Sequence, residues 1–470
     1  RQAFRRGRIS FSGAISDDTL PVSGLRGYVF GEGRFELAND FRLDFGIEAV
    51  SDQSYLLEYD YSDKDRLRRD IALSRVRRDE FIRAELVHYK SLRPGESNAT
   101  LPTMIAGARY ERRLFPRAIG GELRLSVEAS AHRRTSGTLA DGDGDGIGDG
   151  LDVARTGVTA DWRRNWTLAG GLRAGVVTGV AVDAFDIRQD ATTQGTHTQA
   201  TPSAALSLRW PLAKTAADGA THVIEPMAML GWQGGSRLGV PNDESTRVEF
   251  DAGNLLSLSR FPAPDRRERG GAAAIGVNWS RIGAAGWNSD LTLGQVFFDD
   301  PDPAFTRSSG LDGDHSDLLV AGQVDTPGGF AMAARGLLDP EALSLSKAEA
   351  RARWQTAALS LGSSVVWLRQ DAAEDRVNDQ AEWAFDGAYR LSRHWTGRAD
   401  WRYDLANDQA ARAGVALEYR NECVEIEMSV SRRFTSSALV APSTNFGFTV
   451  GLSGFSANAK GDSYARTCRN

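Results

Sequence analysis

Long segments of alternating polarity constrain this sequence more than any other feature. From Trp395 to Asp404, every second residue is apolar, aromatic or small, and the residues between them are polar or charged. Successive side chains of a β-strand point to opposite faces, so this pattern predicts a strand with one apolar face. The same alternation recurs at 42–49, 412–420 and 424–431. The sequence therefore predicts many strands, each with an apolar face and a charged face.

The length of these segments separates two kinds of β-protein. Strands of a soluble sandwich are usually about five or six residues long. Here the alternation continues for about ten residues, and a tilted strand of about 9 to 11 residues can cross the hydrocarbon layer of a bilayer. Trp residues such as Trp166 and Trp395 follow short turns, where they would either form an aromatic girdle at the membrane interface or pack under the turns.

The predicted connections alternate between long and short. Long ones are expected at 135–152, 183–200, 234–271, 298–316, 369–380 and 434–444, and intermediate ones at 337–347 and 404–410. Short ones are expected between them, at 162–166, 212–220, 281–287, 325–329, 391–394, 420–423 and near Trp354. Outer-membrane barrels have short turns at one rim and long loops at the other. We therefore predict an all-β fold, a large antiparallel transmembrane β-barrel of roughly 22 to 24 strands.

The predicted barrel domain covers residues 1–456, and residues 457–470 form a C-terminal tail. The sequence begins at Arg1, with no initiator Met and no apolar signal-peptide region, so we expect a fragment whose upstream part is missing.

Composition and motifs exclude several functions. The net charge is −6, and no basic segment is long enough to follow a phosphate backbone, which argues against nucleic-acid binding. No apolar stretch approaches the roughly 18 to 20 residues of a transmembrane helix. GxSxG, HExxH and paired-carboxylate motifs are absent, so we expect neither an enzyme nor a bound organic cofactor.

Several segments resemble, in order, the lipopolysaccharide (LPS)-assembly outer-membrane protein family LptD, also called the organic-solvent-tolerance protein family. They are Val50 to Leu56, Ile224 to Met227, Glu249 to Phe261 with the charged residues up to Gly270, Cys423 in a late turn, and Gly451 to Gly454. The resemblance extends from about residue 25 to 456.

The resemblance implies a Gram-negative outer-membrane barrel that receives LPS from a periplasmic transport bridge and inserts it into the outer leaflet. In that family the saccharide passes through the lumen, and the acyl chains leave between the first and last strands. It also implies an LptE-like lipoprotein plug, a periplasmic jelly-roll domain and two to four first strands that precede this sequence, so this chain alone should not close a barrel.

The resemblance also gives expectations for the C-terminal region. Asn445, Gly447, Val450 and Leu452 fit the signal read by the barrel-assembly machinery, although the segment could simply be another strand. Envelope proteins fold where disulfides persist. Cys423 and Cys468 could therefore bond each other, or each could bond a cysteine of the missing upstream part, as in the family.

The segment 141–152 is a candidate Ca²⁺ loop. Its possible ligands are Asp141, Asp143, Asp145, the carbonyl of Ile147, Asp149 and Asp152, a spacing at which oxygen atoms can surround one Ca²⁺. A final Asp in place of Glu and the lack of flanking helices argue against this interpretation. The alternatives are a flexible acidic loop and loose bridging to cations between LPS phosphates.

Two further features concern the interior of the barrel. Arg398, Asp400 and Arg402 are predicted to face the lumen, where they would either form a hydrophilic path for sugar and phosphate groups or only pair across strands. The 234–271 connection contains the apolar stretch 254–261, so we expect it to fold into the lumen or over its mouth, with ion pairs among Arg260, Asp265, Arg266 and Glu268.

Two other functions remain open at this stage. A different large outer-membrane channel or transporter would have the same strand pattern, but it would conduct without a lipoprotein. A secreted, calcium-stabilised β-protein acting as an adhesin would be soluble, and the apolar strand faces argue against it.

Overall fold

A computed structural model of the chain describes residues 2–19, 24–142, 144, 147–284, 286–435 and 441–452. Within these residues, 24 strands form one sheet. Neighbours along the chain pair antiparallel, and β12 continues β11 because both pair with β13. The all-β prediction is confirmed, and the strand count lies at the upper end of the predicted range.

The first twelve strands are β1 (Gln2–Phe4), β2 (Gly7–Asp18), β3 (Gly24–Glu36), β4 (Phe41–Val50), β5 (Arg66–Arg77), β6 (Glu80–Ser91), β7 (Met104–Leu114), β8 (Glu122–Arg133), β9 (Asp152–Thr167), β10 (Arg173–Arg188), β11 (Gly195–Arg209) and β12 (Leu212–Thr215). The other twelve are β13 (Thr221–Gln233), β14 (Gly270–Ile282), β15 (Asn288–Phe298), β16 (Leu318–Asp325), β17 (Phe330–Asp339), β18 (Ser344–Gln355), β19 (Leu359–Leu368), β20 (Gln380–Arg390), β21 (Trp395–Asp404), β22 (Gln409–Arg420), β23 (Val424–Arg433) and β24 (Ser443–Leu452). The described helices are short: α1 (Tyr55–Glu58), η1 (Ala38–Asp40), η2 (Ala169–Gly171), η3 (Arg307–Ser309) and η4 (Ala372–Glu374).

The connections divide between two rims. One rim carries the long loops, which include 51–65, 134–151, 234–269, 299–317 and 369–379. The other rim carries turns such as 78–79, 168–172, 326–329 and 421–423. Two connections predicted to be intermediate, 340–343 and 405–408, are four-residue loops, because the adjoining strands extend further than their polarity alternation indicates.

The outer surface of the sheet is apolar and uncovered. Ile15 and Leu25 are each 78% exposed, and Phe446 on β24 is 80% exposed. A soluble protein rarely leaves a continuous apolar surface open to water, whereas a barrel presents one to lipid. The apolar half of the predicted alternation therefore forms the outside of the molecule.

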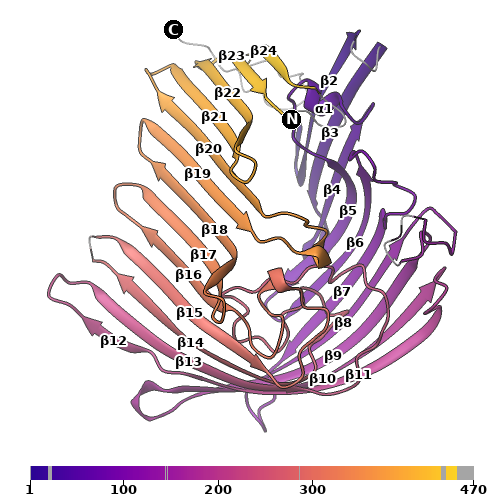
Figure 1. Ribbon diagram of the computed structural model, residues 1–470, viewed down its shortest axis with the longest axis vertical. Coiled ribbons are helices and arrows are strands. Elements are labelled where there is room, and N and C mark those ends of the chain that lie inside the picture. The colour runs from indigo at the N-terminus through magenta and orange to yellow at the C-terminus, as the bar shows by residue number, and fades with distance from the viewer. Residues whose placement is uncertain are drawn as a thin grey trace.

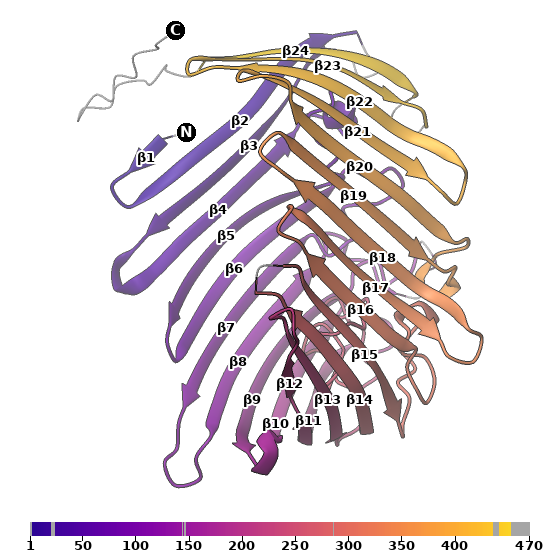
Figure 2. The same cartoon turned by 90° about the vertical axis from the view of Figure 1, so that its left-hand side faces the viewer.

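The sheet curves into a barrel whose first and last strands approach each other without pairing. Figures 1 and 2 show β23 and β24 returning toward β2 and β3 at one end of the molecule. Among the described residues, β24 pairs with β23, and β2 pairs with β1 and β3. The described sheet thus has two free edges.

The buried apolar residues gather where loops meet the inner face of the sheet. The largest cluster combines strand residues such as Ala274, Val296 and Leu319 with loop residues Leu255 and Phe305. Figure 1 shows these loops, in pink and orange, inside the curve of the sheet. In the part of the chain that the structure describes, no helix is long and apolar enough to cross a membrane.

Candidate functional site

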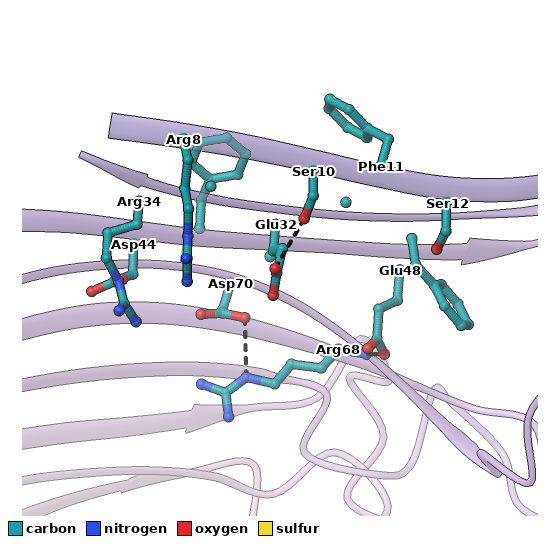
Figure 3. Close-up of a pocket in the computed structure, with 15 residues that line it drawn as sticks. Arg8, Ser10, Phe11, Ser12, Glu32, Arg34, Asp44, Glu48, Arg68 and Asp70 are labelled. Atoms are coloured by element: carbon teal, nitrogen blue, oxygen red, sulfur yellow. Dashed lines mark hydrogen bonds and ion pairs between the residues drawn. The ribbon is translucent and has the colours of Figure 1, made fainter. Parts of the chain in front are cut away.

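The inner face of the first strands is lined with charge. A pocket of about 550 Å³ opens between β2 and β5, and Arg8, Glu32, Arg34, Asp44 and Arg68 are among its lining residues. Figure 3 shows these side chains pointing into a common space from four neighbouring strands. Arg34 pairs with Asp44 at 2.7 Å across β3 and β4. Cross-strand ion pairs of this kind keep a wall polar while neutralising most of its charge.

The predicted path residues lie on one face of β21. Arg398 pairs with Glu418, and Asp400 lies 3.5 Å from the guanidinium of Arg412. Arg402 lies 3.6 Å from Glu382. All three therefore take part in cross-strand pairing, and the side chains of Arg398 and Arg402 still remain half exposed. Whether they form a path for a polar ligand stays a prediction.

The segment 51–65 is fastened to the first strands by one buried arginine. Arg26 on β3 is 3% exposed. Its guanidinium donates two hydrogen bonds to Asp52, at 2.9 and 2.7 Å, and pairs with Glu58 at 2.7 Å. Burial raises the pKa of Asp52, but hydrogen bonds from Arg26, Ser51 and Ser54 outweigh it and hold that pKa well below its ordinary value.

Aromatic packing supports the same segment. Tyr55 and Leu56 are fully buried against Leu67. The hydroxyl of Tyr59 donates to Asp18 at 2.6 Å. The one-turn helix α1 is therefore held by tertiary contacts, since a single turn is unstable alone.

The other side of segment 51–65 contacts the last strands. Asp60 Oδ2 accepts hydrogen bonds from Arg412 Nη2 at 2.7 Å and from Ser431 Oγ at 3.2 Å. Asp63 lies 3.2 Å from Arg412 and 3.9 Å from Arg402. We call residues 51–65 the seam strap, because they contact strands on both sides of the gap between β24 and β2. Sequence reasoning noted Val50 to Leu56 only as a family segment and missed the partners, which lie about 350 residues away.

The loop 234–269 lies inside the barrel and docks through apolar residues. Leu255 is 1% exposed and sits against two glycines, Gly276 on β14 and Gly294 on β15, which face each other in the register. A methyl group at Gly276 would lie 2.8 Å from Leu255 Cδ2, and one at Gly294 would be closer still. The two glycines thus form a notch for Leu255, which confirms that the apolar stretch is not free surface.

Ion pairs fasten the first half of the same loop to the sheet. Arg134 and Asp243 form a bidentate pair at 2.8 and 3.1 Å with both side chains buried. Arg155 on β9 pairs with Glu244 at 3.0 Å. The sheet therefore holds the loop start through β9 and through the residue that follows β8.

Within the loop, Arg260 and Glu268 form a buried pair at 2.5 Å, as predicted. Burial dominates both groups, since it raises the pKa of Glu268 and lowers the pKa of Arg260. Asp265 instead accepts a hydrogen bond from the backbone of Ser245, at 3.2 Å. A predicted ion pair at Asp265 is therefore replaced by a hydrogen bond.

The candidate Ca²⁺ loop is only partly described. Asp143 and Asp145 lie outside the described residues. Asp141 accepts the backbone N–H of Gly144 at 2.7 Å, and Asp152 accepts that of Arg134 at 2.9 Å. Ile147 packs on the apolar cluster around Leu151, whereas Asp149 lies against Gly142. Among the described residues, no group of three or more His, Cys, Asp or Glu side chains is placed to hold a metal ion.

Two other predictions concern the C-terminal region. Cys423 lies in the turn between β22 and β23, where its N–H donates to Asn421 at 2.9 Å. Cys468 and the tail lie outside the described residues, so the disulfide pairing stays a prediction. Asn445, Gly447, Val450 and Leu452 all lie on β24. A side chain at Gly447 would meet Ser429 on β23.

Tryptophans bind neighbouring turns at the short-turn rim. The indole N–H of Trp162 donates to the carbonyl of Gly120 at 2.9 Å, and that of Trp210 donates to Gly170 at 3.0 Å. Trp354 donates to Gly328 in the same way, also at 3.0 Å. An indole with an apolar body and a hydrogen-bonded N–H suits a membrane interface.

A long curved run of antiparallel strands with an apolar outside and a charged inside defines a large outer-membrane β-barrel. The sequence matches the family described as LptD, LPS transport system D, over residues 24–395. The chain therefore belongs to the LptD family, as the sequence predicted, and is a multi-pass barrel of the outer membrane that serves LPS transport.

Several solved structures of receptors resemble this chain at low sequence identity. The siderophore receptor PirA from Pseudomonas aeruginosa is 11% identical, with a TM-score of 0.49, over 95% of this chain and 79% of that chain. The alcaligin receptor FauA from Bordetella pertussis is 11% identical, with a TM-score of 0.45, over 92% of this chain and 74% of that chain. The ferric enterobactin receptor PfeA from Pseudomonas aeruginosa is 9% identical, with a TM-score of 0.45, over 96% of this chain and 80% of that chain. Among curated proteins, none matches this sequence significantly.

Proposed function

We propose that this barrel inserts LPS into the outer leaflet of the outer membrane and that it performs no chemical reaction. The saccharide would pass along the charged inner wall while the acyl chains leave sideways into lipid. The observation that carries this proposal is the separation of two surfaces, a charged interior at Arg34, Asp44 and Arg402 and an exposed apolar exterior. An amphiphile with a large polar part and several acyl chains needs both surfaces at once.

The gap between β24 and β2 supports a lateral exit. Strand pairing is the strongest link between neighbouring strands of a barrel. At this gap, the described contacts are instead side-chain contacts of the seam strap, chiefly Arg412 with Asp60 and Asp63. Such contacts can separate without breaking a hydrogen-bonded ladder, and opening there would release lipid.

The proposal also assigns partners and domain limits. A periplasmic bridge would deliver LPS, an LptE-like lipoprotein would occupy the lumen, and the barrel-assembly machinery would read Asn445, Gly447, Val450 and Leu452 on β24. The barrel domain would cover 1–456, with a tail at 457–470. Cys423 and Cys468 would form disulfides, either with each other or with upstream cysteines.

Site-specific photo-crosslinking in cells tests the proposal. Probes replace Arg398 and Arg402 on the charged face of β21, and Trp401 on the opposite face serves as the control. We expect LPS adducts at Arg398 and Arg402 that disappear when upstream transport is blocked. A folded, inserted barrel without such adducts would favour a porin-like channel or another transporter.

A further inference from the structure

A pocket under the loop 234–269 contains more arginines than carboxylates. It has a volume of about 270 Å³, and its charged lining residues are Arg237, Arg266, Arg267, Arg269, Asp265 and Asp302. The remaining lining includes Phe185 near the end of β10 and Gln199 near the start of β11, which places the pocket at the long-loop rim.

Two of the four arginines are already neutralised. Arg237 pairs with Asp300 at 2.9 Å and with Asp302 at 3.3 Å. Arg267 pairs with Asp183 on β10. Of these three carboxylates, only Asp302 lines the pocket, and Asp183 and Asp300 lie outside its lining. Among the described residues, Asp265 is therefore the one lining carboxylate that these pairs do not use.

Arg269 is a buried cation with neutral partners only. It is 7% exposed, and its guanidinium donates to Gln199 Oε1 at 3.0 Å and to the carbonyl oxygens of Ser236 and Glu268, each at 3.3 Å. Burial lowers the pKa of Arg269, the positive charges of Arg267 and Arg237 lower it further, and the carboxylates of Asp183 and Asp302 offset only part of this effect. A buried charge that no carboxylate contacts directly is costly, so this site is electrostatically incomplete.

Arg266 adds a second uncompensated charge. It is partly exposed, it borders this pocket and a neighbouring one, and none of the ion pairs among the described residues includes it. Asp265 forms no ion pair with it, since the described contacts of that carboxylate are hydrogen bonds from Ser245. The loop therefore brings two unpaired guanidinium groups to one small cavity.

We propose that this pocket binds a phosphate- or carboxylate-bearing anion, with Arg266 and Arg269 taking up its charge. Guanidinium groups bind such oxyanions through parallel hydrogen bonds. The volume lies just below the range of pockets for drug-sized ligands, so the occupant is one small anionic group. A sugar-bound phosphate and free inorganic phosphate share this chemistry. The inference does not depend on LPS insertion, because it concerns binding and not transport.

The test is calorimetric titration of the full-length protein, together with the proposed LptE-like lipoprotein, in detergent. The probes are inorganic phosphate and glucose 1-phosphate, with glucose and sodium chloride of matched ionic strength as blanks. We expect saturable binding that Arg266→Gln and Arg269→Gln each weaken about tenfold. Arg393→Gln is the matched control, since Arg393 is exposed in the turn 391–394 at the opposite rim.

Each outcome decides the proposal. Binding of glucose 1-phosphate alone would identify a sugar-bound anion, and binding of phosphate alone would identify a free anion. No saturable binding of either probe, or undiminished binding in both variants, would overturn it.

Thermal unfolding separates binding from a structural role. If Arg269 binds the anion, Arg269→Gln loses the rise in unfolding temperature caused by anion, whatever its effect on the anion-free protein. A lower anion-free temperature with an unchanged rise would overturn the role of Arg269. If this variant does not fold, Arg266→Gln decides alone, because Arg266 has no described hydrogen bond whose loss would unfold the loop.

Discussion

Arg412 on β22 donates to Asp60 in the seam strap over 2.7 Å, although 352 residues separate them along the chain. Asp60 has a backbone φ of 57°, in the left-handed region, which turns the chain so that its carboxylate faces the last strands. This contact joins the two ends of the described sheet from the inside. How firmly the edges at β24 and β2 are held together therefore depends on a few side chains.

A double-mutant cycle measures the coupling free energy between Asp60 and Arg412. We expect Asp60→Asn and Arg412→Gln each to lower the free energy of unfolding by about 1 to 2 kcal/mol, because the pair is charged and partly buried. Their effects should couple by about 1 kcal/mol in urea unfolding of the detergent-solubilised barrel. Glu341→Gln in the exposed loop 340–343 serves as the control, and strictly additive effects would contradict a direct contact.

Acid should loosen the seam strap through Asp52. Its pKa lies below the ordinary value of 3.8 in the folded protein, so its contribution to stability is complete above about pH 4 and is lost as pH falls further. We expect Asp52→Asn to lower the unfolding temperature at pH 7 and to flatten its decline between about pH 4 and 2. A parallel decline in wild type and variant would show that Asp52 is not the group that titrates.

Filling the glycine notch should release the loop 234–269. We expect Gly294→Ala to cost about 1 to 3 kcal/mol, because the new methyl group collides with Leu255. Limited proteolysis should then cut within 254–268, a segment that we expect to resist cleavage in the wild type. Leu255→Ala in the same chain should recover part of the stability, and easy cleavage of the wild type would contradict the docked loop.

The indole hydrogen bonds should stabilise the short-turn rim. We expect Trp210→Phe to lower the free energy of unfolding by about 0.5 to 1.5 kcal/mol, since the carbonyl of Gly170 loses its donor. Trp367→Phe is the matched control, because no hydrogen bond of that indole is described. Equal effects of the two substitutions on urea unfolding would assign the loss to ring packing.

Calcium binding at 141–152 remains open to direct measurement. We expect Ca²⁺ to raise the unfolding temperature and Asp141→Asn with Asp149→Asn to abolish that rise, because both changes remove oxygen ligands of the candidate loop. Asp152 is less suited to this test, since it already accepts the N–H of Arg134. An unchanged unfolding temperature on adding Ca²⁺ or a chelator would leave the loop as acidic surface.

The strands were predictable because a bilayer imposes a local rule. Each crossing needs about ten residues with one apolar face, and this rule is visible within any single segment, such as 395–404. The alternation of connections between two rims followed for the same reason, since antiparallel neighbours return to alternate rims. Individual bounds were less accurate, since 162–166 lies within β9 and the connection predicted at 183–200 covers only 189–194. Family segments such as Glu249 to Phe261 then identified the kind of barrel.

The interior was less predictable because its contacts join distant parts of the chain. The sequence indicated that 254–261 needs an apolar surface and that Arg260 and Glu268 would pair, since both features lie within one loop. It contained no sign that Gly276 and Gly294 form the notch for Leu255, because strand register brings the two glycines together.

By itself, the sequence determined an outer-membrane barrel, because the polarity of alternate residues must match lipid on one side and a charged interior on the other. Only the tertiary structure decided which charges meet. Arg412 reaches Asp60, and Arg269 is left without a carboxylate, because the curvature of the sheet and the path of its inner loops bring side chains together irrespective of their separation in sequence.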